Sequence, residues 1–131
     1  MNMAGQCLDH PSGAVALIDL TGQARCDVTY GALSDMVDGL ARTLQRLVAP
    51  GDRVGVLLSQ TPWCAAAHLA IWKIGAISVP LFKLFKYDAL QTRVSDAGLT
   101  LVLTDAEGAA LVDDLSPALL AETAGIDGET V

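Results

Sequence analysis

The sequence predicts an α/β protein of three layers, with helices over a mostly parallel sheet joined by βαβ crossovers and an N-terminal β-hairpin before them. Short apolar runs alternate with amphipathic segments between residues 53 and 112, and only a few residues connect them. This alternation is typical of right-handed βαβ crossovers. The 131 residues fit a single domain (1–131), and a hydrophobic share of 52% predicts a folded interior.

The hairpin is predicted around the turn Thr21-Gly22-Gln23. Residues 14–20 form a mostly apolar run, and residues 25–29 follow directly after the turn. Two short segments that flank a turn containing glycine are typical of antiparallel strands.

A first long helix is expected after Thr29, whose hydroxyl can cap the first turn by accepting a backbone N–H. Its apolar residues recur at spacings of four and three and form one stripe: Leu33, Val37, Leu40, Leu44 and Leu47. The turn at residues 49–52 contains Pro50-Gly51 and is expected to end the helix.

Three short apolar runs predict parallel strands at residues 53–59, 76–81 and 99–104. Pro80 should lie at the end of its strand, because proline has no N–H to donate to a ladder. Between the first two strands, Thr61 and Pro62 are expected to begin a helix that Gly75 ends.

The second crossover helix carries a stripe at Tyr87, Leu90, Val94 and Ala97 and is expected to close at Gly98. After the third strand, Asp105 is expected to cap a short helix that runs through Val112. Ser116-Pro117 is expected to begin a further helical turn, and residues 125–131 to form an irregular or disordered tail.

Charge and cysteine content exclude several classes of protein. The formal net charge is −7 and the basic residues are scattered, so nucleic acid is not expected as a partner. Three cysteines without a CxxC pair argue against a disulfide framework and favour the cytoplasm. The sequence shows neither a signal peptide nor eighteen consecutive apolar residues, so no membrane span is expected.

The 131 residues contain no GxxxxGK[ST] loop, GxGxxG fingerprint or GxSxG elbow. His10 and His68 have no partner at metal-ligand spacing. His68 lies on an apolar helix and is better explained as a core or interface residue, and Cys64 as a small buried hydrophobe. Asp113 and Asp114 fit a solvated helix end. We therefore expect no catalytic residue and no metal site.

Lys83 and Lys86 follow the carboxyl end of the strand that ends at Leu81, with Arg93 farther along. Ligands of open α/β sheets gather outside these strand ends, so the two lysines can meet an anionic ligand there. Solvated loop charges remain the simpler interpretation of these residues.

Five segments resemble, in order, motifs of the adenylate-forming superfamily, which contains acyl-CoA synthetases, peptide-synthetase adenylation domains and luciferases. They are VTYGAL (28–33), PGDRVGV (50–56), LSQTP (58–62), WKIGAISVPL (72–81) and RVSDAG with LTD (93–98 and 103–105). Ala32 stands where the family usually has an acidic residue, and Trp63 where Glu is common. The residues AHLA (67–70) and PLFKLF (80–85) are most similar to short- and medium-chain acyl-CoA synthetases of the acetyl-CoA synthetase type.

The resemblance implies the N-terminal subdomain of the adenylate-forming fold and, in the parent protein, a ligase of fatty acid metabolism. The family joins a small carboxylic acid to ATP as acyl-AMP and passes the acyl group to CoA, while Mg²⁺ offsets phosphate charge. The family's TSGTTGxPKG loop, YxxTE segment, ribose-binding Asp and C-terminal Lys have no counterpart in these residues. The chain is therefore expected to be an inactive N-terminal fragment that supplies scaffold, binds no ATP, CoA or Mg²⁺ by itself, and has the remainder of its polypeptide as partner.

In acetyl-CoA synthetase relatives, the CoA adenine lies near the segment that aligns with Phe82, Lys83 and Leu84. The resemblance implies a stacking face at Phe82 and a charge for a CoA phosphate at Lys83, although relatives often carry glycines in place of Lys83 and Leu84. Two alternatives stay open: a module that binds CoA or another nucleotide without catalysis, and a half-domain that forms a homodimer through exposed apolar surface.

Overall fold

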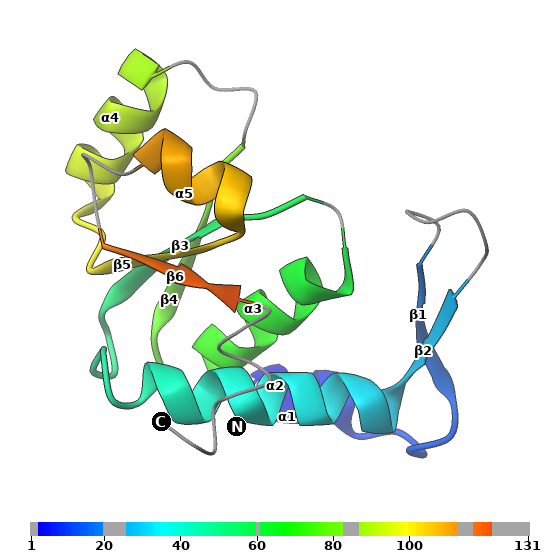
Figure 1. The fold of residues 1–131 in the computed structure, drawn as a ribbon. Coiled ribbons are helices and arrows are strands. Elements are labelled where there is room, and N and C mark those ends of the chain that lie inside the picture. The colour runs from blue at the N-terminus through cyan, green and yellow to red at the C-terminus, as the bar shows by residue number, and fades with distance from the viewer. Residues whose placement is uncertain (1–2, 20–25, 60, 83–86, 113–116, 122–131) are drawn as a thin grey trace.

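The computed structural model describes residues 3–19, 26–59, 61–82, 87–112 and 117–121. A parallel sheet of four strands, in the order β4-β3-β5-β6, forms the centre of the molecule (Figure 1). Its strands are β3 (Arg53–Leu57), β4 (Ile77–Pro80), β5 (Leu101–Thr104) and β6 (Ala118–Leu120). A separate antiparallel pair is formed by β1 (Val15–Asp19) and β2 (Cys26–Thr29), which confirms the predicted hairpin strands.

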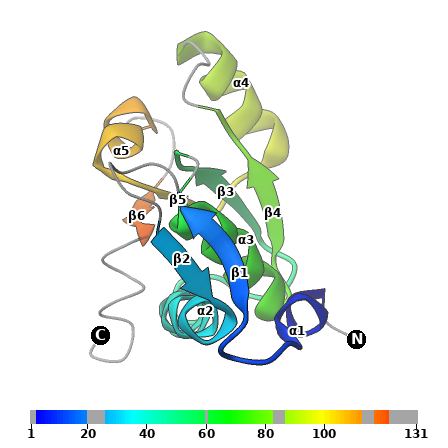
Figure 2. The ribbon, with the colours of Figure 1, turned by 90° about the vertical axis from the view of Figure 1, so that its right-hand side faces the viewer.

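Helices cover both faces of the parallel sheet, as Figure 2 shows from the side. One face carries α2 (Tyr30–Leu44) and α3 (Pro62–Lys73), with α1 (Met3–Leu8) packed against α3; the other carries α4 (Tyr87–Ala97) and α5 (Ala106–Val112). Each face has its own cluster of buried side chains, and the two clusters share no residue. The predicted three-layer α/β class is confirmed.

The strands are added to the sheet first on one side of β3 and then on the other, so the sheet has a topological switch point. From β3 the chain passes through α3 to β4 on one side, and then through α4 back across to β5 on the other side of β3. Strands β3 and β5 are therefore neighbours whose outgoing connections diverge. Ligands of open α/β sheets bind outside the carboxyl ends at such a point.

The larger core is built on the predicted stripe of α2. Leu33, Val37, Leu40 and Leu44 are buried, and Ala32 N donates to Thr29 Oγ1 at 3.1 Å, so the predicted cap is confirmed. Leu47 was expected to continue the stripe, but it is 51% exposed. The reason is that α2 ends at Leu44, and Leu47 lies in the following turn, where its N–H donates to the Leu44 carbonyl.

The predicted ends of the other helices are confirmed with one difference. Pro62 begins α3 and Gly75 takes a positive φ after it, but the Thr61 side chain makes no capping hydrogen bond although its backbone is extended. Asp105 caps α5, because its Oδ1 accepts from Gly108 N at 2.8 Å.

The helical turn predicted at Ser116-Pro117 is wrong. Ser116 lies outside the described residues, and the residues after Pro117 form strand β6, with Leu119 paired to Leu103 of β5. The open edge of β5 offers backbone groups that a strand satisfies, and three residues are too few for periodicity to distinguish the two structures. Helix α1 was not predicted. The turn at 20–25, the pair Asp113 and Asp114, and the tail at 125–131 fall outside the described residues. Among the described helices, none is both long and apolar enough to cross a bilayer.

Candidate functional site

Phe82, the first residue of the predicted CoA edge, follows the carboxyl end of β4. Leu81 N donates to the Val56 carbonyl at 2.9 Å, and the Leu81 side chain is only 3% exposed because it packs in the smaller core. The next residue, Phe82, is 53% exposed. Leu81 is thus fixed by its backbone and its side chain, and Phe82 presents aromatic surface directly beyond this fixed point.

The structure describes only one residue of this predicted site, Phe82. Lys83, Leu84 and Lys86 lie outside the described residues, so no geometry relates them to Phe82. Arg93, the more distant cation, lies on α4 with an exposed side chain.

The carboxyl ends of β3 and β5 are filled by the protein itself. Thr104 is completely buried, and its Oγ1 donates to the Leu57 carbonyl at 2.6 Å. Gly108, in α5, lies directly against this pair, since an ideal Cβ on it would stand 1.9 Å from Thr104 Oγ1 and 3.0 Å from the Leu57 carbonyl oxygen. Protein atoms therefore occupy the space between these two strand ends.

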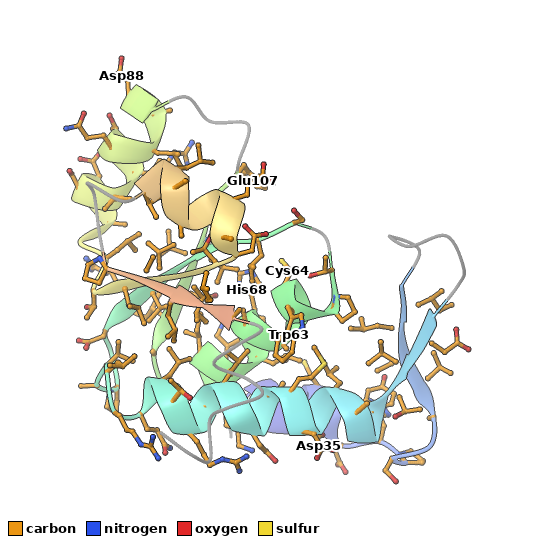
Figure 3. The ribbon with its side chains drawn as sticks, viewed as in Figure 1. Asp35, Trp63, Cys64, His68, Asp88 and Glu107 are labelled. Carbon is orange, nitrogen blue, oxygen red and sulfur yellow. The ribbon has the colours of Figure 1, made fainter. Side chains whose placement is uncertain are left out.

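The half-buried groups of α3 do not form a nucleophile and its base. Burial raises the pKa of the Cys64 thiol and lowers the pKa of the His68 imidazole. Both shifts favour the neutral form, whereas an activated cysteine needs a lowered pKa. The His68 ring instead lies 6.1 Å from the Trp72 ring, and Figure 3 shows His68 with Cys64 and Trp63 along α3. This arrangement fits packing residues.

Carboxylates are spread over separate helices. Asp35 lies on α2, Asp88 at the far end of α4 and Glu107 on α5 (Figure 3). Within the described ranges, no three or more His, Cys, Asp or Glu side chains are grouped so that they could hold a metal ion.

A comparison with protein families and known proteins gives consistent matches. The family model described as AMP-binding enzyme matches residues 4–130. The acetyl-coenzyme A synthetase of Penicillium chrysogenum is 40% identical over 82 residues, which are 62% of this chain and 12% of that enzyme. The acetyl-coenzyme A synthetase of Xanthobacter autotrophicus is 37% identical over 115 residues, which are 82% of this chain and 18% of that enzyme.

Solved structures agree on the fold. An acyl-CoA synthetase of Brucella canis superposes on all of this chain (100%) and on 28% of its own, with a TM-score of 0.87 and 24% identity. That identity supports likeness of fold. The chain spans only 12% and 18% of the length of the two curated relatives, so it corresponds to one part of such a protein.

Proposed function

The chain belongs to the AMP-binding enzyme family, and on this basis we propose that it forms part of the scaffold of an ATP-dependent, AMP-forming acyl-CoA synthetase. In the whole protein, a carboxylate and ATP give acyl-AMP and pyrophosphate, and acyl-AMP and CoA then give acyl-CoA and AMP. The observation that carries the proposal is the 37% identity to an acetyl-coenzyme A synthetase over most of the chain. Acetate or another short acid is the proposed substrate class.

The chain's own contribution is structural. Its matched motifs contain turns, caps and strand ends, such as Thr29, Gly75 and Gly98, which place the sheet and its helices. We propose that the adenylating groups and the Mg²⁺ and ATP sites are supplied by other parts of the polypeptide, and that the chain alone is inactive. The described thiols Cys7 and Cys64 are free, which suits the reducing cytoplasm as its location.

Phe82 is the proposed contact to CoA. An exposed aromatic ring on a fixed backbone can stack on an adenine base, and such stacking is sequence-tolerant and worth about 1–3 kcal/mol. Lys83, the next residue, can pair with a CoA phosphate. The support for Phe82 is its exposure together with the anchoring of Leu81 by Val56.

A chimera tests the proposal. This chain replaces the aligned segment of the Xanthobacter autotrophicus enzyme, and we expect the folded chimera to catalyse acetate-dependent exchange of pyrophosphate into ATP. Phe82→Ala should raise the KM for CoA in the complete reaction and leave the exchange unchanged, because the exchange needs no CoA. Leu47→Ala removes another exposed apolar side chain, in the turn after α2, and should change neither activity. A folded chimera without exchange would refute the scaffold role, and equal losses in both reactions would refute the CoA contact.

Self-association is the second candidate function. Within the part of the chain that the structure describes, seven large apolar side chains are at least 36% exposed: Val15, Ile18, Leu47, Ile77, Phe82, Leu111 and Leu120. These exposed apolar side chains are suited to contact a partner. Because the chain covers only 18% of a relative's length, this partner is either the remainder of the polypeptide or a second copy of the chain. Sedimentation velocity separates these, because a concentration-dependent dimer supports self-association and a monomer at all concentrations contradicts it. Calorimetric titration of the chain with CoA tests the further alternative of a binding module without catalysis.

A further inference from the structure

Helix α4 is firmly closed at its carboxyl end. Gly98 has φ +62°, and its N–H donates to the Ser95 carbonyl at 3.3 Å, while Leu99 N donates to the Val94 carbonyl at 3.4 Å. These two bonds form the Schellman arrangement, which satisfies carbonyls that a helix end otherwise leaves without partners.

Arg53 ties this closed end to the central strand of the sheet. Its Nη1 donates to the Ala97 carbonyl at 2.9 Å, and its own carbonyl accepts from Thr100 N at 2.8 Å. The positive charge of the guanidinium also lies at the negative end of the helix dipole, where it is stabilising. The last turn of α4 is therefore linked to the first residue of β3 from both sides of Gly98.

The rest of α4 is weakly attached. Of its described side chains only Leu90 and Val94 are buried, whereas α2 buries seven residues. The amino end of α4 projects away from the sheet, and Asp88 marks this far end in Figure 3. Regions with little buried apolar surface open at lower free energy than the core.

We propose that α4 opens as a unit about Gly98 before the rest of the fold unfolds, with the bond between Arg53 and the Ala97 carbonyl as its latch. When the helix opens, Leu90 leaves the smaller cluster and the buried side chain of Val94 becomes exposed. Leu81 belongs to that cluster, so opening uncovers apolar surface next to Phe82. The proposal concerns the motion of the helix and holds whether or not CoA binds at Phe82.

Hydrogen exchange across a urea series tests the opening. In the full chain, amides of residues 91–97 should exchange faster than those of β3 and β5 and with a weaker dependence on urea, because local opening exposes little surface. Equal protection and equal urea dependence in α4 and the sheet would show that α4 opens only by global unfolding, and would overturn the proposal.

Arg53→Ala then tests the latch. The bond is already broken both when α4 is open and when the protein is unfolded, so its loss destabilises the native state equally against these two states. Amide exchange should therefore accelerate about three- to tenfold in α4 and by the same factor in β3 and β5. If α4 instead frays from its amino end with the latch intact, its amides stay unchanged while those of the sheet accelerate, and this result contradicts the latch. Arg46→Ala removes an exposed cation after α2 and should leave the α4 amides as they are. Should Arg53→Ala not fold, Arg53→Met makes the same comparison, because it keeps the apolar stem of the side chain and removes every donor.

Discussion

An ideal Cβ on Gly108 would lie 1.9 Å from Thr104 Oγ1, so the buried hydroxyl of β5 leaves room only for glycine at this point of α5. The hydroxyl is held in place by its bond to the Leu57 carbonyl, which joins β5 to β3, and Gly108 of α5 packs directly against this bond. Space and not backbone conformation dictates this glycine, because its φ is not positive.

Gly108→Ala should therefore lower the free energy of unfolding by about 1–3 kcal/mol, the usual penalty of overpacking a core. The sign is informative, because alanine is otherwise favoured over glycine in a helix by about 1 kcal/mol. The matched control is Gly5→Ala in α1, where a Cβ meets nothing within 4 Å and stability should stay equal or rise. Urea denaturation measures both, and an unchanged midpoint for Gly108→Ala would contradict the packing account.

Gly55→Ala should be less harmful than Gly108→Ala. The added Cβ would meet Leu99 Cδ1 at 2.8 Å and Leu81 Cδ1 at 3.0 Å, and these are the tips of side chains that can shift. We expect a smaller loss in the same urea experiment, because flexible tips relax where a buried hydroxyl cannot. A loss at Gly55 as large as that at Gly108 would show that the smaller core is rigid around Leu81.

The stability of the protein should fall as the pH is lowered through the ordinary pKa of histidine, about 6.5. Burial lowers the pKa of His68, so below that pH the unfolded chain binds a proton that the folded protein resists. His68→Gln should flatten this part of the pH dependence. Unfolding free energies of both proteins between about pH 7.5 and 5 isolate the contribution, and identical profiles would show that His68 titrates normally in the fold.

Trp72 Nε1 donates to Ser78 Oγ at 3.0 Å, which links the last turn of α3 to β4. Ser78→Ala leaves a part-buried indole N–H without this partner and should lower the unfolding free energy by about 1 kcal/mol. A double-mutant cycle with Trp72→Phe checks the assignment, since the two changes should then be less than additive. Additive effects would mean that the bond contributes nothing to stability.

Local chemistry made most of the fold predictable. Thr29, Pro62 and Gly98 act through the residues next to them, and the stripe from Leu33 to Leu44 needs only the period of a helix. Strand β6 was missed because its pairing depends on the open edge of β5, which is a tertiary feature.

The contacts that join distant segments were also not predictable. Thr104 bonds a carbonyl 47 residues away, and Arg53 reaches one 44 residues away. A glycine inside a short helix, as at Gly108, was the one signal that a close approach existed there. For the candidate site, the sequence identified Phe82 only through family resemblance, and its exposure beside buried Leu81 comes from the structure.

We propose that this chain supplies scaffold for an acyl-CoA synthetase and no adenylating groups. The decisive measurement is acetate-dependent exchange of pyrophosphate into ATP, made side by side for the purified chain and for the chimera. We expect no exchange above background for the chain and clear exchange for the folded chimera. Acetate-dependent exchange by the purified chain itself would contradict it.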